Sequence, residues 1–552
     1  MKQDDKATGT GKSFDPTVGC QTIWTGVLGG FNIILLAAAY SVYSKKIMAS
    51  GGPKIYDCLA WMPKGLSFNF INRNYFDILF IVAIGFTIMA AWEFLKAPAQ
   101  RAAALVIALS GIVASWAVAF GAQPFFTSPT VHFMGWQWTN METVWAVTGS
   151  AMSLLLIWRI REFRPGDHNL PPPRWALKTA FFRWISGLVF FSAVLSIFLA
   201  HPFYGNGYYE NWRITVSYLF TIYALFGLPY GFITNLLRKS VSEDRKDAGF
   251  VLTLIFHSAI RASFKRKIGP LRRALYNKRN LCALRDLGVK FFFVPLMLTF
   301  LFTEISGFFR SFPSLLDQSL FIAGNMTNSL ASLADPLKPG PWNPLFDFFY
   351  GSVFHGIFVM DVSLSLVGYI CSSRWLDNKS RSVEPTLSGW FVALMCYPPF
   401  NGISTNYMPY DRHFPGSQYL DFTHYGLFDP STAVALTNFT DFTLKIATLA
   451  AFTIYVWATM AFGLRFSNLT NRGIIAQGPY AYIRHPAYIS KNFAWWTENI
   501  RNFSSPWQIV FLAGWNIVYF LRALTEERHL KKDPDYLAYC EKVKYRFIPG
   551  WW

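Results

Sequence analysis

Polar residues concentrate in one turn near the end of the sequence, which reads Gly478-Pro479-Tyr480-Ala481-Tyr482-Ile483-Arg484-His485-Pro486-Ala487-Tyr488. Strongly apolar stretches lie on both sides of this turn. A second polar segment follows them, Arg522-Ala523-Leu524-Thr525-Glu526-Glu527-Arg528-His529. The apolar chain between the two segments is long enough to enter a membrane and return. We therefore expect both segments to meet on one face and to form a single site.

The turn also carries signals for where helices end and begin. Gly478-Pro479 is expected to end an incoming helix, because proline has no amide hydrogen to donate. His485-Pro486 is expected to begin the next one, since proline is favoured in the first helical turn. Arg484 and His485 would then stand at a helix N-terminus, where unpaired amides and the helix dipole attract an anion. The alternative is a membrane-surface turn, with Arg484 at the headgroups and the tyrosines in an interfacial belt.

The composition of the whole chain indicates a membrane protein. Among its 552 residues 53% are hydrophobic, with 54 Phe and 21 Trp. Repeated apolar runs of about 18 to 25 residues match the length of helix that crosses a hydrocarbon layer roughly 30 Å thick. We therefore expect an all-α, polytopic integral membrane protein with about 10–12 transmembrane helices. The expected spans are residues 22–43, 77–95, 102–121, 143–158, 182–200, 214–236, 287–304, 346–372, 388–400, 442–464, 487–500 and 506–523. Residues 388–400 and 487–500 are too short or too polar for simple spans and are candidates for re-entrant segments. The stretch Pro398-Pro399-Phe400-Asn401-Gly402 is expected to break the first of these runs.

The formal net charge of +19 is concentrated in short connections between apolar runs. This distribution is typical of the positive-inside bias and of contact with anionic headgroups, and it argues against nucleic acid as a partner. Segments 159–181 and 237–286 are basic and are predicted to be cytoplasmic, as are both termini. Aromatic loops with almost no lysine, 122–142, 201–213 and 401–440, are predicted to lie outside. One loop does not fit this orientation, because residues 44–76 are basic and yet would lie outside.

The N-terminal residues 1–15 lack the pattern of a signal peptide, so the first apolar run is expected to stay as a spanning helix. The six cysteines are scattered and indicate neither a disulfide framework nor a metal site. Residues 1–236 are expected to form a six-span region of unknown role, followed by the basic loop 237–286. An amphipathic stretch near 251–275 either lies on the cytoplasmic leaflet or belongs to a solvated linker. Residues 287–440 are expected to form further membrane helices and an external loop. Residues 441–552 are expected to form a separate module.

The C-terminal motifs resemble those of a known superfamily. The pattern Gly-x-Tyr-x-x-x-Arg-His-Pro-x-Tyr, an apolar hairpin and then Glu526-Glu527 is similar to the isoprenylcysteine carboxyl methyltransferase and phospholipid methyltransferase superfamily. The closing stretch 536–550 is similar to that superfamily's usual ending, and the resemblance covers about residues 440–552. It implies a membrane-embedded methyltransferase that uses S-adenosylmethionine and acts on a lipid or lipid-linked acceptor. The protein would lie in a bacterial inner membrane or an endomembrane, with its catalytic face toward the cytoplasm.

The resemblance also implies which residues bind the cofactor. On one side of the site they would be Tyr480, Arg484, His485, Pro486 and Tyr488, and on the other Glu526 and Glu527. These residue types suit the ligand, because an arginine binds a carboxylate and a glutamate accepts hydrogen bonds from an ammonium or a ribose. Aromatic faces such as Tyr488 or Trp495 suit a sulfonium. Methyl transfer is an in-line displacement, so approach geometry and exclusion of water are the main demands on the protein.

The catalytic residues we expect are Arg522 and Glu527. Arg522 precedes Glu526 by four residues, which sets both on one helix face. Arg522 would orient an anionic or polar acceptor, and Glu527 would act as a base if the acceptor must lose a proton. Read alone, the run 526–528 fits a solvated charged segment beside the membrane better than a site. No metal site is predicted.

Two other functions stay open at this stage. The ending 539–550 also resembles the sterol C14/Δ7-reductase family, which binds NADPH and acts on a lipid double bond, although Pro486 and the paired glutamates favour the methyltransferase. Six spans, a basic loop and six more spans is also the outline of a transporter.

Several polar residues lie within apolar runs. In the segment after the turn they are Lys491, Asn492, Glu498 and Asn499, which depart from the superfamily pattern and either line an acceptor tunnel or mark a segment that does not cross. Upstream they are Glu304, His355 and Asp361, for which helix packing is the expected role.

Overall fold

The computed structural model describes residues 16–42, 45, 130–133, 136–139, 172–205, 210–236, 248–265, 268–331, 342–370 and 378–550. The expected spans 77–95, 102–121 and 143–158 lie outside the described residues. The longer helices are α1 (Pro16–Val42), α5 (Pro173–Ala200), α6 (Glu210–Leu236), α7 (Ala248–Lys265), α9 (Lys278–Gly324), α11 (Trp342–Ile370), α14 (Pro430–Phe462), α15 (Pro486–Asn499) and α16 (Pro506–Leu530). The shorter ones are α8 (Gly269–Tyr276), α10 (Met326–Ala331), α12 (Leu387–Leu394), α13 (Phe400–Tyr407) and α17 (Pro534–Lys542).

Strands are few and short in the described part of the chain. β1 (Thr130–Phe133) pairs antiparallel with β2 (Trp136–Thr139). β3 (Ser382–Val383) pairs antiparallel with β4 (Thr470–Asn471). Five described helices are long and apolar enough to cross a membrane, and they cover Pro173–Ala200, Lys278–Gly324, Asn343–Ile370, Pro430–Arg465 and Pro506–Leu530. The prediction of an all-α, polytopic membrane protein is therefore confirmed.

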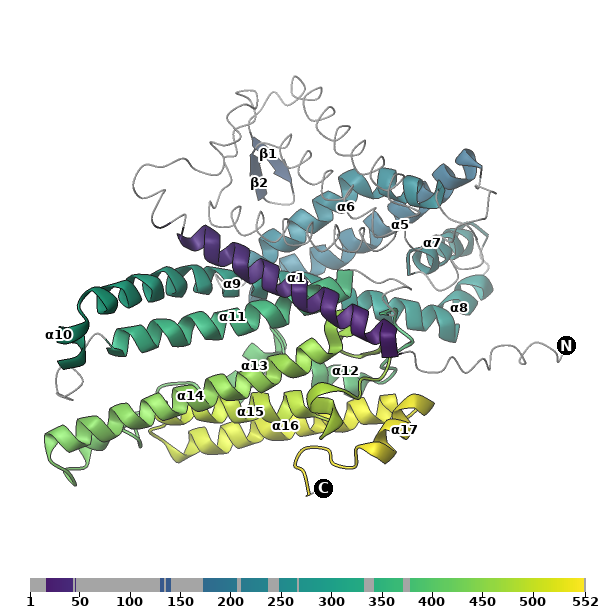
Figure 1. Ribbon diagram of the computed structural model, residues 1–552. Coiled ribbons are helices and arrows are strands. Elements are labelled where there is room, and N and C mark those ends of the chain that lie inside the picture. Colours follow the sequence, from purple (N-terminus) through teal and green to yellow (C-terminus); the bar gives the residue numbers. More distant parts are fainter. Residues whose placement is uncertain are drawn as a thin grey trace.

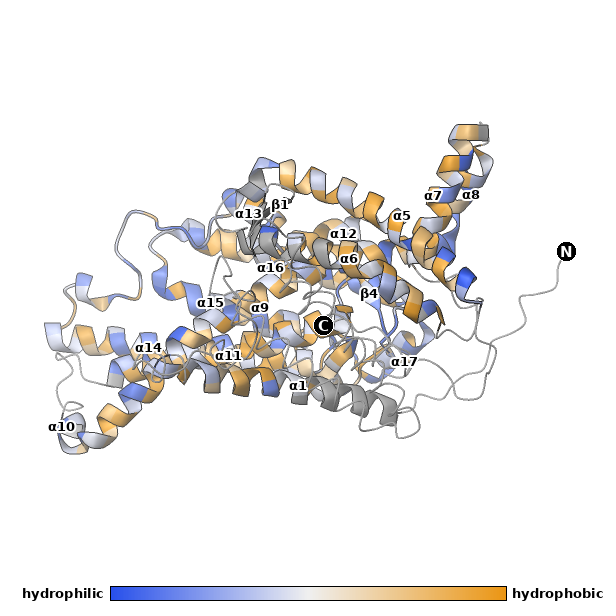
Figure 2. Cartoon of the chain, turned by 90° about the horizontal axis from the view of Figure 1, so that it is seen from above, coloured by the Kyte–Doolittle hydropathy of each residue, from blue (hydrophilic) through white to orange (hydrophobic). Residues whose placement is uncertain are grey.

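The long helices lie roughly side by side (Figure 1). α9 packs along α11, α11 contacts α14, and α14 packs along α15, while α5 and α6 form a pair that reaches α9 through α6. The long helices are mostly apolar along their length, and the hydrophilic residues collect in the loops and near helix ends (Figure 2). A core of aromatic and aliphatic side chains fills the space between α1, α9 and α11, including Phe293, Phe302 and Tyr369. This packing supports the C-terminal helices that carry the site.

Three expectations about element boundaries need correction. α9 has 47 residues and continues well beyond the expected span 287–304, through Pro295 and Pro313. A helix of that length measures about 70 Å, more than twice the thickness of a hydrocarbon layer. α14 begins at Pro430 rather than near residue 442, because Asp429 caps it and accepts a hydrogen bond from the Thr432 amide. The stretch 251–275 forms two helices, α7 and α8, instead of one.

The expected break near residues 398–402 is present. α12 ends at Leu394, and α13 begins at Phe400, directly after the prolines. Because proline cannot continue a helix, the apolar run 388–400 yields a helix of two turns instead of a span. α12 packs against α16, so this short helix stands beside the end of the chain that holds both polar segments.

The polar residues of the upstream helices join neighbouring helices. His355 Nδ1 of α11 lies 2.8 Å from Glu304 Oε2 of α9. Gly307 makes room for the imidazole, since a Cβ there would lie 2.3 Å from its Cε1. On the other side of α11, the Asp361 carboxylate accepts hydrogen bonds from the hydroxyls of Tyr455 and Thr459 on α14, at 3.0 and 2.7 Å. These contacts agree with the helix-packing role expected for all three residues.

Candidate active site

The turn at residues 478–488 has the local structure that its sequence predicts. Gly478 has a φ of +61°, and its Cα approaches α14 so closely that a Cβ would lie 3.3 Å from Cβ of Ala461. A short 3-10 helix then runs over Gly478–Ala481. His485 has a non-helical φ of −126°, and Pro486 occupies the first turn of α15. The chain therefore changes direction at the glycine and restarts as a helix at the proline.

The second polar segment returns to this turn on α16. Ser505 and Gln508 form a capping box at the start of that helix, and α16 packs against α15. At the far end of the hairpin the Tyr488 hydroxyl donates to Glu526 Oε2 at 2.6 Å. His485 Nε2 lies 3.3 Å from Glu527 Oε1. The prediction that the two segments meet is thus confirmed.

Glu527 sits in a cluster of cations. Its carboxylate lies 3.3 Å from Arg484 Nη1, 3.2 Å from Arg546 Nε and 3.8 Å from Lys531 Nζ. Only 2% of the Glu527 side chain is exposed. A buried carboxylate that is shared by several cations is held in its ionised form, and it ties the segments that carry them together.

Arg484 holds the C-terminal segment in place. Its Nε donates to the Val543 carbonyl at 2.8 Å, and its Nη2 donates to the Lys544 carbonyl at 2.9 Å. The backbone amide of Arg484 donates to the Tyr545 carbonyl, and that of His485 donates to the Arg546 carbonyl, both at 3.0 Å. Most donors of this guanidinium are therefore committed to protein groups.

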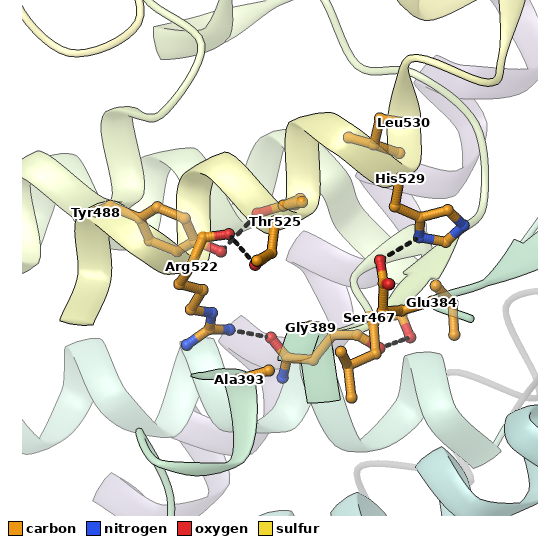
Figure 3. Close-up of a pocket in the computed structure, with 13 residues that line it drawn as sticks. Glu384, Gly389, Ala393, Ser467, Tyr488, Arg522, Thr525, His529 and Leu530 are labelled. Atoms are coloured by element: carbon orange, nitrogen blue, oxygen red, sulfur yellow. Dashed lines mark hydrogen bonds and ion pairs between the residues drawn. The ribbon is translucent and has the colours of Figure 1, made fainter. Parts of the chain in front are cut away.

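Two cavities adjoin the hairpin. The larger has an empty volume of about 1020 Å³, which includes space open to solvent, and it lies between α14, α15, α16 and the loop 465–475. The smaller has a volume of about 450 Å³ and lies between α16 and α12. In Figure 3, Arg522 extends from α16 toward the helix that carries Gly389 and Ala393, and a dashed line joins His529 to Glu384 at the other end of the smaller cavity. The two cavities share one wall, which contains Ser467, Asn468, Thr470, Tyr488, Arg522, Glu526 and Leu530.

The predicted site residues divide into two groups. Those that line the larger cavity are Tyr480, Arg484, His485, Tyr488, Arg522 and Glu526. Pro486 and Glu527 line neither cavity. Pro486 begins α15, and Glu527 binds the cations described above. Burial raises the pKa of the Tyr480 phenol well above its usual value, so this side chain stays neutral.

Arg522 lies among aromatic rings. Its guanidinium carbon is 5.1 Å from the ring centroid of Tyr488, 5.5 Å from that of Tyr397 and 5.8 Å from that of Tyr519. One of its nitrogens donates to Asn468 Oδ1. Because three ring faces surround the charge, the side chain is fixed in direction without a carboxylate partner among the described residues.

The analysis of the sequence missed much of the cavity wall. The loop 465–475 contributes Asn468, which also donates to the hydroxyls of Tyr369 and Tyr397 at 3.1 Å. Glu384 of the smaller cavity is buried and accepts hydrogen bonds from Thr386. Neither segment shows a helical or strand periodicity, and only Glu384, which precedes Pro385, has a local signal in its proline break. Within the described ranges, no group of three or more His, Cys, Asp or Glu residues could hold a metal ion.

Comparison with known proteins gave one finding. Residues 434–533 match the family model described as phospholipid methyltransferase. No curated protein and no solved structure matched the chain in the corresponding comparisons. The matched residues contain most of α14, the turn, α15 and α16, and so include every predicted site residue. The C-terminal region of this membrane protein is therefore similar to the phospholipid methyltransferases, within the superfamily that its motifs indicated.

Proposed function

We propose that this protein transfers a methyl group from S-adenosylmethionine to a lipid or lipid-linked acceptor. The observation that carries the proposal is the hydrogen bond between Tyr488 and Glu526, which joins both ends of the α15–α16 hairpin at the wall shared by the two cavities. The match to the phospholipid methyltransferase family supports methyl transfer as the reaction. The long apolar helices support a lipid as the acceptor.

The larger cavity has the residue types that the cofactor requires. Small-molecule sites are lined mostly by apolar and aromatic side chains with a few polar groups that fix orientation, and this cavity has such a lining. Glu526 can accept hydrogen bonds from an ammonium or a ribose, and the faces of Tyr488 and Tyr519 can contact a sulfonium. When bound, the cofactor would supply an electrophilic methyl group. Arg484 would stabilise the wall of the cavity, since most of its donors already bind protein carbonyls and Glu527.

The smaller cavity suits the polar part of the acceptor. Gly389 and Ala393 form its floor on one face of α12. Two residues away from each, on the opposite face, Leu387 and Phe391 are 89% and 65% exposed. A step of two residues turns a helix by about 200°, so α12 presents small residues to the cavity and large apolar ones outward. A lipid could rest its tail on that outer face while its polar group reaches the shared wall.

We assign the roles of the charged residues from their positions. Arg522 orients the acceptor, because its guanidinium belongs to both cavities. Glu526, rather than Glu527, is the candidate base, since Glu526 lines both cavities. Glu527 binds several cations, which hold its carboxylate ionised and weaken it as a base. The basic residues around the larger cavity support a cytoplasmic catalytic face.

Calorimetry on the purified full-length protein tests the proposal. We expect S-adenosylhomocysteine to bind and NADPH not to bind, with Glu526→Gln weakening the binding of S-adenosylhomocysteine. Binding of NADPH alone would support the lipid reductase instead. If neither ligand binds, the enzyme assignment fails, and a transporter that uses the hairpin as its substrate path becomes the better explanation.

The acceptor can be identified with a methyl-labelled cofactor. Total lipid extract is incubated with the protein, separated and searched for label, and the same extract with the Arg522→Met variant is the control. We expect one labelled lipid class that is lost in the variant.

A further inference from the structure

A second cation faces the larger cavity beside Arg522. Lys491 lies on α15, about one and a half turns beyond Pro486, and it lines that cavity. Its Nζ is 5.1 Å from the ring centroid of Tyr455 and 5.5 Å from that of Trp495. Within the described residues, no carboxylate lies within ion-pairing distance of Nζ, 4.0 Å. Lys491 and Arg522 therefore both present a charge to this cavity against aromatic walls.

Two acidic side chains of this region, Asp361 and Glu526, accept hydrogen bonds from other residues, and the Asp361 charge also acts on Lys491. The Asp361 carboxylate accepts hydrogen bonds from Tyr455 and Thr459, which hold it on the α14 side of the wall. The Glu526 carboxylate accepts the hydrogen bond from Tyr488. Neither makes an ion pair with Lys491 or Arg522 in the described part of the chain. The two cations thus lack a direct acidic partner from the protein.

Two like charges in a cavity walled by aromatic rings repel each other and lose much of their hydration. The ring faces offset part of this cost, at about 0.5 to 2 kcal/mol for each cation–π contact. An oxyanion between the two charges would offset far more, because it would accept charge-assisted hydrogen bonds from both. Two cations that line one cavity and act on each other electrostatically are suited to receive a negatively charged group.

We propose that Lys491 and Arg522 form an anion-binding site in the larger cavity, which takes a carboxylate or a phosphate. The proposal rests on the proposed function, since the same cavity would hold the cofactor. Such an oxyanion could belong to either reactant. It is either the α-carboxylate of the cofactor or the acid group of the lipid acceptor, and the experiment distinguishes them.

The test uses two pairs of probes, and in each pair only one member carries a carboxylate. S-adenosylhomocysteine is compared with 5′-methylthioadenosine, which lacks the amino-acid part, and oleate is compared with oleyl alcohol. Binding of each is measured on the full-length protein in nanodiscs, for the wild type and for Lys491→Met, Lys491→Gln and Lys491→Arg. Lys542→Met, at an exposed position on α17, is the matched control.

We expect the acidic member of one pair to lose affinity by at least about tenfold in Lys491→Met and in Lys491→Gln. The neutral member should be unaffected, and Lys491→Arg should retain most of the affinity. Loss confined to S-adenosylhomocysteine assigns the site to the cofactor carboxylate, and loss confined to oleate assigns it to the acceptor.

The anion site is overturned if both neutral variants bind both acidic probes as the wild type does, or if the wild type binds neither acidic probe. The proposed function fails separately, when the wild type binds neither nucleoside. In that case a Lys491-dependent preference for oleate over oleyl alcohol still supports the anion site.

Discussion

Glu526 and Glu527 are adjacent on α16 and face different surroundings. The Glu526 carboxylate accepts a hydrogen bond from Tyr488 and lines both cavities. The Glu527 carboxylate lines neither and lies within 3.3 Å of Arg484, His485 and Arg546 nitrogens. A step of one residue turns a helix by about 100°, which accounts for the difference. One acid of the pair is thus a candidate for chemistry, and the other holds the C-terminal segment to the turn.

The first prediction separates these roles by stability. Glu527→Gln should destabilise the protein by about 3 kcal/mol, because it removes the carboxylate shared by several cations and leaves them unpaired. Glu526→Gln should change stability by less than about 0.5 kcal/mol, since its carboxylate is exposed. Thermal unfolding of the ligand-free protein, followed by tryptophan fluorescence, measures both variants. Equal melting temperatures would contradict the assignment.

The second prediction concerns the contact across the hairpin. Tyr488→Phe removes the hydrogen bond to Glu526 but keeps the ring that stacks on His485, with ring centroids 5.4 Å apart. We expect the affinity for S-adenosylhomocysteine to fall by at least about tenfold, because one hydrogen bond to a charged group is usually worth about 1.5 to 3 kcal/mol. Tyr482→Phe is the matched control, because this tyrosine lies on the same turn with its side chain exposed. An unchanged affinity in Tyr488→Phe would show that this hydrogen bond does not contribute to the binding of S-adenosylhomocysteine.

The site illustrates what a sequence can predict without coordinates. The apolar hairpin between the two polar segments predicted that they lie together, because the chain must return to the membrane face from which it started. The glycine and proline signals correctly predicted the turn, the start of α15 and the break after α12. The start of α14 had a signal as well, Asp429 followed by Pro430. The expected span 442–464 missed it because that span was placed on the most apolar part of the segment.

Other features depend on packing that no local pattern encodes. The direction of Glu527 is set by cations from the turn and from the tail, which are distant in sequence. The aromatic surroundings of Lys491 include Tyr455, which belongs to α14. The loop 465–475 forms a cavity wall with backbone and mixed side chains, so it lacks periodicity. Such contacts are tertiary, and only the fold reveals them.

The third prediction tests the smaller cavity. A Cβ at residue 389 would lie 2.5 Å from Cγ of Glu384 and 2.6 Å from its Cδ, so Gly389→Ala must displace that side chain. We expect transfer of labelled methyl groups to lipid to fall by at least about tenfold, while the affinity for S-adenosylhomocysteine changes by less than about twofold, because added bulk in a packed site costs roughly 1–3 kcal/mol. Gly324→Ala is the control, since a Cβ there meets nothing within 4 Å. Equal loss of cofactor binding and transfer would mean that the two cavities act as one.

The fourth prediction concerns pH and the start of α14. The Ser431 hydroxyl and the Thr432 amide donate to Asp429, and these bonds hold the pKa of its carboxyl well below the usual value. A carboxyl whose pKa is lowered by folding stabilises the folded state above its unfolded pKa of about 3.9, and this stabilisation is lost as the pH falls through the folded pKa. The Tm difference between the wild type and Asp429→Ala should therefore be constant from about pH 5 to 8 and should narrow below about pH 4. Ser505→Ala removes the cap of α16, which is a hydroxyl that does not titrate, so its Tm difference should not depend on pH. If the Tm difference between the wild type and Asp429→Ala widens on acidification, the carboxylate does not stabilise this helix end.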